Sequence, residues 1–233
     1  MQEYNRLTHL FAILDDMKSL SLSRPLVIFV IGLPGAGKSF FARQFAETFS
    51  APIVSHDYLR YQMFPDPAFS KEEDELIAQI AGNEFSELLK TQCTIILDGG
   101  NNNYDDRLKL MQIAKKKGYG ALVVWIQTDE RSARLRATRR NPQKRDGDAL
   151  NVSMPEEAFD AAKAAFMAPG KGEEFVVVSG KHTYATQAKV VLRRFVTVQG
   201  PSISMPQPPT TQHGRSPHNG SDVRTQSRSH LIS

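Results

Sequence analysis

The sequence predicts an α/β fold in which helices cover both faces of a five-stranded parallel sheet. Three observations predict it. Apolar runs typical of strands alternate with segments whose apolar residues recur at helical spacing. Most of these runs are continuous, as in parallel strands that are buried on both faces. A glycine-rich turn directly follows the first run, and in such sheets ligands bind beyond the carboxyl ends of the strands.

The first segment, residues 3–18, is expected to form a helix because five apolar side chains share one stripe: Tyr4, Leu7, Phe11, Leu14 and Met17. This helix either packs on the core or binds a partner. Residues 19–25 form a connector. Then come a strand at 26–31, a helix that begins near Lys38 and ends at Phe49, and a short strand at 51–55.

The acidic residues 71–75 open a helix that runs to about Lys90. A strand at 94–98 and a helix at 105–117 follow, and Gly118 ends that helix. The fourth and fifth strands are expected at 121–126 and 175–178. Between them lie a basic helix at 131–140 and a helix at 155–168 with proline near its first turn. A helix at 183–198 closes the fold.

The expected organisation is an N-terminal helix and connector over residues 1–25, one domain over 26–198, and a tail over 199–233. The tail holds five prolines and seven serines but few large apolar residues. It cannot bury enough surface to offset its chain entropy, and we expect it to be disordered.

The most specific motif is the loop after the first strand, Gly32-Leu33-Pro34-Gly35-Ala36-Gly37-Lys38-Ser39, which fits the phosphate-binding pattern G-x-x-x-x-G-K-[ST]. The glycines allow backbone N–H groups to turn toward phosphate oxygens, and the following helix adds its positive end. Lys38 is expected to reach the β- and γ-phosphates, and Ser39 to place its hydroxyl on Mg²⁺. We count Phe40 with the loop as part of the nucleotide site. The alternative is a chance glycine-rich loop.

Two carboxylates follow the next strands. Asp57 comes just after the second strand, where it could take a proton from an attacking hydroxyl. Arg60 shares its helical face and could hold an acceptor phosphate; the alternative is a helix cap at Asp57 with a surface arginine. Asp98 ends the third strand, where a carboxylate can hold Mg²⁺ directly or through water.

Arginines and lysines crowd the segment from 131 to 145. The commonest fate of such a run is a solvated face. We favour a closing lid at about 129–151, whose arginines neutralise the charge on a transferring phosphoryl group. Arg136 and Arg140 are the leading candidates because they lie four residues apart on one helical face.

The composition sets few further limits. The formal net charge of +4 is weak support for nucleic-acid binding. The single cysteine, Cys93, cannot form an internal disulfide, and it is expected to be a buried small side chain. Neither a secretory signal nor an apolar run of about 18 residues is visible, so we expect a cytoplasmic protein without membrane contact.

Together these residues resemble the P-loop kinases around polynucleotide 5′-hydroxyl kinase, which are AAA_33-type ATP-binding proteins. Zeta-toxin-like and chloramphenicol-phosphotransferase-like kinases are relatives of this group. The resemblance covers about residues 26–195 and implies a P-loop NTPase fold, a three-layer α/β/α sandwich with a helical lid. It also implies that Asp57 is the general base, that Arg60 contacts an acceptor phosphate, and that Arg136 and Arg140 belong to the lid. The pattern after the third strand is Asp98-Gly99-Gly100-Asn101, where the polynucleotide kinases have one similar to Asp-Thr-Asn.

The function expected from the sequence is transfer of the γ-phosphoryl group of ATP–Mg²⁺ to a hydroxyl, with a polynucleotide 5′ end as the best guess for the acceptor. The choice of ATP over GTP comes from the resemblance. Two alternatives remain open at this point. One is a kinase for a metabolite, nucleotide sugar or antibiotic, and the other is a nucleotide-binding switch without transfer chemistry. The oligomeric state is not predicted.

Overall fold

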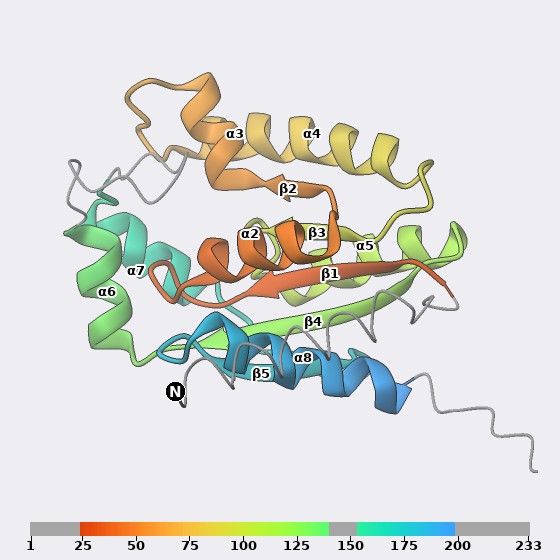
Figure 1. Cartoon of the computed structure of the whole chain (residues 1–233). Helices are drawn as coiled ribbons and strands as arrows, with labels where there is room; N and C mark the ends of the chain where they lie inside the picture. Colours follow the sequence, from red (N-terminus) through yellow and green to blue (C-terminus); the bar gives the residue numbers. More distant parts are fainter. Residues whose placement is uncertain (1–23, 140–152, 199–233) are drawn as a thin grey trace, which may run out of the picture. The chain divides into compact units, whose positions relative to one another are not determined.

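The computed structural model describes residues 24–139 and 153–198, and it contains the expected alternation of strands and helices (Figure 1). The strands are β1 (Leu26–Ile31), β2 (Ile53–Ser55), β3 (Ile95–Asp98), β4 (Gly120–Gln127) and β5 (Phe175–Ser179). The helices are α2 (Lys38–Phe49), α3 (His56–Met63), α4 (Lys71–Leu88), α5 (Tyr104–Lys116), α6 (Glu130–Thr138), α7 (Glu156–Ala164) and α8 (Tyr184–Val198).

The five strands form one parallel sheet in the order β2-β3-β1-β4-β5. β1 is central, since it pairs with β3 on one side and with β4 on the other, and it is buried at every position because helices cover both faces of the sheet. The register places Val30 opposite Asp98, so the last residue of β3 lies one residue before the end of β1. The turns that follow β1, β2 and β3 therefore meet at one edge of the sheet.

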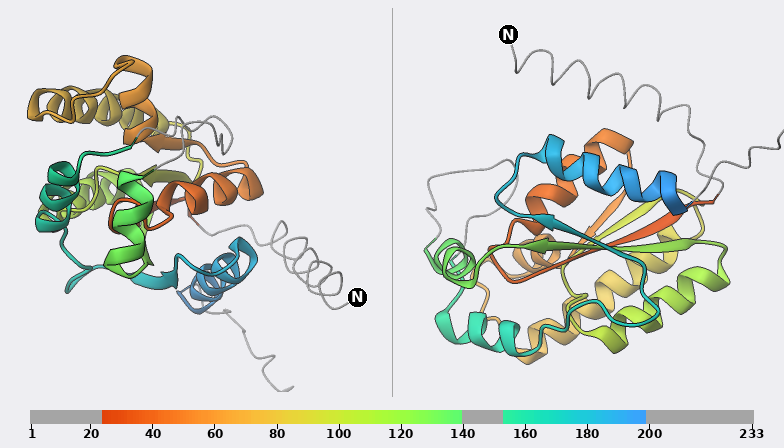
Figure 2. Two further views of the ribbon diagram at one scale, coloured as in Figure 1. Left: turned by 90° about the vertical axis from the view of Figure 1, so that its left-hand side faces the viewer. Right: turned by 90° about the horizontal axis from the view of Figure 1, so that it is seen from below.

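Helices cover both faces of the sheet, as the continuous apolar strands predict (Figure 2). On one face, α2 and α8 pack Phe41, Phe45 and Leu192 against the strands. On the other, α4 and α5 supply Phe85 and Ala114. Helices α6 and α7 lie beyond the carboxyl ends of the strands, next to the loop that follows β1 (Figure 1). The P-loop NTPase-like α/β fold is thus confirmed.

Two local expectations are wrong. The helix expected at 155–168 ends at Ala164, because the Met167 N–H leaves the helical pattern and donates to the Asn102 carbonyl at 2.8 Å. Cys93 is exposed rather than buried, since it lies in the turn before β3 and not within the strand.

Three expectations fall outside the described residues. They are the helix at 3–18, the part of the lid from 140 to 151, and the tail at 199–233. Among the residues that the structure describes, no helix is long and apolar enough to cross a membrane.

Candidate functional site

The loop after β1 has the backbone that its glycines predict. Gly32, Gly35 and Gly37 have φ values of +145°, +74° and +105°, which side chains rarely tolerate. Gly35 also lies against the backbone of α6, where a Cβ atom would overlap the Ala133 carbonyl oxygen. Glycine is therefore required at position 35 both for conformation and for space.

The polar groups of this loop are arranged to receive an anion. Lys38 lies at the start of α2, and its Nζ donates to the Leu33 carbonyl at 3.1 Å. Gly37 precedes the helix and offers no capping side chain, so the first N–H groups of α2 can bind a phosphate. Behind the loop, the Thr128 hydroxyl donates to the Ala36 carbonyl at 3.0 Å and braces it. These features fit a phosphate chain over the loop.

Asp98, at the end of β3, is a buried carboxylate beside the loop. Burial raises its pKa, and the charge of Asp57 raises it further, while Lys38 and the hydroxyls of Ser39 and Ser55 act in the opposite direction. Its Oδ2 accepts a hydrogen bond from Ser55 at 3.1 Å. Its Oδ1 is buried and accepts none from the residues that the structure describes.

The free Oδ1 of Asp98 fits a hard cation. Mg²⁺ prefers oxygen ligands and is usually held by one or two carboxylates together with substrate phosphates. The hydroxyl of Ser39 and the carboxylate of Asp98 supply such a set beside the loop. Within residues 24–139 and 153–198, no cluster of three or more histidine, cysteine or acidic side chains forms a separate metal site.

Asp57 lies in the first turn of α3, and its side chain is exposed. The alternative reading of Asp57 as a helix cap is wrong, because the cap is Ser55, whose hydroxyl accepts the Tyr58 N–H at 3.4 Å. Asp57 is close enough to Asp98 to raise its pKa. Next to it, burial lowers the pKa of His56, against the opposing charge of Asp57. This position leaves the Asp57 carboxylate open to an incoming molecule.

Arg60 is not at the surface. Its side chain is buried and forms ion pairs with Glu73, at 2.8 Å, and with Asp74. The guanidinium also lies 5.3 Å from the centre of the Phe69 ring. These contacts tie α3 to the start of α4, so an acceptor phosphate would have to compete with two carboxylates for Arg60.

The expected lid begins on α6. Arg136 is exposed on this helix, and Arg140 lies outside the described residues. A neighbouring arginine, Arg134, was not among the predicted site residues, and it holds α6 on α7. It forms ion pairs with Glu156 at 2.9 Å and with Asp160, and it lies 4.4 Å from the centre of the Phe159 ring.

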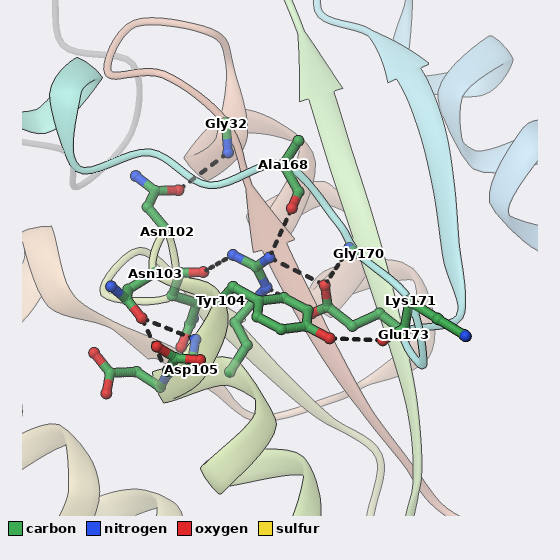
Figure 3. A network of polar contacts seen from close by, with 12 residues as sticks. Gly32, Asn102, Asn103, Tyr104, Asp105, Ala168, Gly170, Lys171 and Glu173 are labelled. Atoms are coloured by element: carbon green, nitrogen blue, oxygen red, sulfur yellow. Dashed lines mark hydrogen bonds and ion pairs between the residues drawn. The ribbon is translucent and has the colours of Figure 1, made fainter.

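A second group, absent from the predicted site residues, connects Arg107 on α5 with Glu173, which is labelled in Figure 3. Arg107 and Glu173 form a buried bidentate ion pair, with distances of 2.7 and 3.1 Å. Arg107 also donates to the Asn101 carbonyl at 2.9 Å. Nearby, the Asn102 side chain accepts the Gly32 N–H at 3.3 Å. Arg107 and Glu173 are 66 residues apart and belong to no local motif, so no sequence pattern indicates that they pair.

A pocket of about 790 Å³ opens on the other side of Leu33. Trp125, Phe166 and Val177 contribute to its apolar lining. The pocket thus reaches the phosphate loop at Leu33 and Thr128, but Lys38, Asp57 and Asp98 are not in its lining.

The comparisons with known proteins agree with this geometry. Residues 27–169 match a family model described as an AAA domain. No curated protein matches the chain. Many solved structures do, at identities that show the fold alone.

Three of the similar structures illustrate the match. A gluconokinase from Sinorhizobium meliloti 1021 is 17% identical with a TM-score of 0.53, and the alignment covers 75% of this chain and 93% of that one. Chaetomium thermophilum Kti12 in complex with ADP-AlF3 is 17% identical with a TM-score of 0.53, and the alignment covers 74% of this chain and 97% of Kti12. The Mycobacterium tuberculosis APS kinase CysC in complex with AMPPNP and APS is 16% identical with a TM-score of 0.51, covering 73% and 97%.

Proposed function

Because the chain belongs to the AAA_33 family of AAA domains, we propose that it is a phosphotransferase that moves the γ-phosphoryl group of ATP to an acceptor hydroxyl. The observation that carries the proposal is the buried Asp98 carboxylate, which lies beside Ser39 of the phosphate loop and has one oxygen that accepts no hydrogen bond from the described residues. A buried charge of this kind is costly unless it meets a cation. Two of the similar structures named above are a gluconokinase and an APS kinase, which supports transfer rather than binding alone.

Each residue of the site has a role in this reaction. The phosphate loop holds the β- and γ-phosphates through its N–H groups, and Lys38 neutralises part of their charge. Ser39 and Asp98 would hold Mg²⁺, which when bound supplies further charge neutralisation. Asp57 accepts the proton of the acceptor hydroxyl as the new oxygen–phosphorus bond forms and the bond to the ADP oxygen breaks. Arg136 and Arg140 would close over the transferring group.

The acceptor is the least determined part of the proposal. A polynucleotide 5′ end rests on the resemblance alone. The ion pairs of Arg60 with Glu73 and Asp74 favour a small-molecule acceptor, because they occupy the guanidinium that a nucleic-acid phosphate would need. The structural similarity to a gluconokinase and an APS kinase also favours a small-molecule acceptor. A nucleotide-dependent switch is the remaining alternative.

The test is a [γ-³²P]ATP transfer assay with Mg²⁺, run on 5′-hydroxyl DNA and RNA oligonucleotides and on a pooled small-molecule extract. Asp57→Asn should lower transfer by about a hundredfold to ten-thousandfold, the usual contribution of a general base, and leave ATP binding intact. Asp66→Asn, a change of the same kind at an exposed position, should transfer like the wild type.

The labelled product distinguishes the acceptors. Label on an oligonucleotide supports the polynucleotide acceptor, and label only in the extract supports a small molecule. If Asp57→Asn keeps full transfer, the assignment of the base is wrong. Slow hydrolysis without acceptor that persists in Asp57→Asn, with no transfer to any substrate, would favour the switch.

A further inference from the structure

The turn after β3 touches both halves of the candidate site. At one end, Gly100 lies against the imidazole ring of His56, in the first turn of α3. At the other end, Asn102 accepts the N–H of Gly32, the first residue of the phosphate loop. Residues 99–102 therefore span the gap between the helix that carries Asp57 and the loop expected to hold the nucleotide.

Contact with His56 and a left-handed backbone favour glycine at position 100. Its φ of +68° is in the left-handed region, and a Cβ atom at this position would overlap three atoms of the imidazole ring. Gly99, at φ +83°, lies against the His56 Cβ. The turn thus fits closely under the start of α3.

The same turn is also fixed by buried groups of other segments (Figure 3). The Arg107 guanidinium donates to the Asn101 carbonyl at 2.9 Å, and Glu173 fixes that guanidinium through two hydrogen bonds. The backbone carbonyl of Asn102 accepts the Met167 N–H at 2.8 Å. Asn102 is thereby fixed through its backbone, which holds its side chain at Gly32.

We propose that residues 99–102 form a positioning bracket, which sets the place of α3 and its Asp57 relative to the phosphate loop, with Asn102 as the contact to the loop. The inference rests on the proposed function. Asn102 is a positioning residue that acts through Gly32, and Gly100 is one that acts through His56. Phosphoryl transfer depends mainly on positioning, so a bracket between base and nucleotide affects the rate without touching the reacting atoms.

The first test uses the full chain and the fluorescent nucleotide MANT-ADP with Mg²⁺. Asn102→Ala removes the hydrogen bond to Gly32, and we expect its Kd for MANT-ADP to rise by up to about tenfold, because nucleotide binding must then order the loop that this bond holds in place. The matched control is Asn103→Ala. The Asn103 side chain caps α5 by accepting the Asp105 and Asp106 N–H groups, so its loss should lower Tm but leave Kd unchanged.

The second test concerns the other end of the bracket. Gly100→Ala should push the His56 ring and its helix away and lower kcat for transfer by about tenfold to a hundredfold, with little change in the Kd for MANT-ADP. Gly118→Ala is its control. Gly118 has a φ of +86° but nothing within 4 Å of an added Cβ, so it carries the same backbone strain without the collision.

The outcomes separate this inference from the proposed function. Wild-type binding of MANT-ADP, weakened in Asn102→Ala but not in Asn103→Ala, supports the bracket. Equal affinities in the wild type and Asn102→Ala overturn it, even if transfer is normal. A wild type that binds no nucleotide overturns the proposed function, and the bracket with it.

Discussion

Replacing Glu173 with glutamine should cost the fold more than any surface charge change. Glu173 and Arg107 are both fully buried, and the carboxylate accepts two hydrogen bonds from the guanidinium and one from the Gly170 N–H at 2.8 Å. Glu173→Gln removes the counter-charge and turns an amide NH₂ toward the arginine donors. The guanidinium then remains buried with only neutral carbonyl partners, at Asn101 and Ala168.

Breaking a buried ion pair from one side typically costs about 3–5 kcal/mol. A domain of this size has a total stability of about 5–15 kcal/mol, so the change removes a large share of it. With about 2–4 °C of Tm per kcal/mol for such a domain, the Tm should fall by about 6–20 °C. Differential scanning calorimetry without nucleotide measures this directly.

The matched control is Glu87→Gln, which breaks the exposed pair with Lys90. Exposed pairs contribute little, so its Tm should stay close to that of the wild type. If Glu173→Gln lowers the Tm no more than Glu87→Gln does, Arg107 is not held by Glu173 and the anchoring of the turn after β3 is refuted.

Three further predictions follow from single contacts. Burial would raise the pKa of Glu73, but hydrogen bonds from the Ala68 N–H, from Arg60 and from the Phe69 N–H outweigh it and lower this pKa. The ionised carboxylate therefore stabilises the fold above its ordinary pKa, and this contribution is lost as the pH falls through the lowered pKa. In Glu73→Gln the stability should depend less on pH in acid, as measured by acid unfolding followed by circular dichroism. Asp98→Asn removes a buried charge whose Oδ1 accepts no hydrogen bond from the described residues, so it should raise the Tm in EDTA while abolishing phosphoryl transfer. Gly35→Ala should weaken MANT-ADP binding, because the added Cβ displaces α6. Its control is Gly82→Ala, which has open space in the middle of α4 and should raise the free energy of unfolding in urea by about 0.5–1 kcal/mol.

The sequence was sufficient for the sheet and the phosphate loop because both depend on local patterns. A continuous apolar run indicates a buried strand, and β1 begins and ends at the expected residues. The loop motif has glycine at positions whose φ angles are positive in the structure. Lys38 and Ser39 lie at the start of α2, as expected. Asp57 lies just after β2, and Asp98 is the last residue of β3. Because the two strands are parallel, their register alone brings both residues to one edge of the sheet.

Partners far along the chain could not be predicted in this way. Arg60 looks like a ligand-binding residue beside Asp57, but its charge is held by Glu73, 13 residues away, once α4 packs on α3. Arg107 belongs to the polar helix α5, and the segment before β5 brings Glu173 to it from 66 residues away. The contact between Gly32 and Asn102 joins residues 70 apart. A charged residue in a sequence carries no mark of whether its partner is water, a ligand or another side chain.

The arginines show how this changes the functional argument. Arg60, Arg107 and Arg134 are each paired with carboxylates of other elements, and each also lies over an aromatic ring. A guanidinium that is held on both its edge and its face serves to fix helices, because moving it to a ligand would leave the carboxylates unpaired. Arg136, exposed on α6, is under no such constraint of burial. Among the described candidates, Arg136 is therefore the better candidate for charge neutralisation during transfer, and Arg60 is better understood as a support for the helix that carries Asp57.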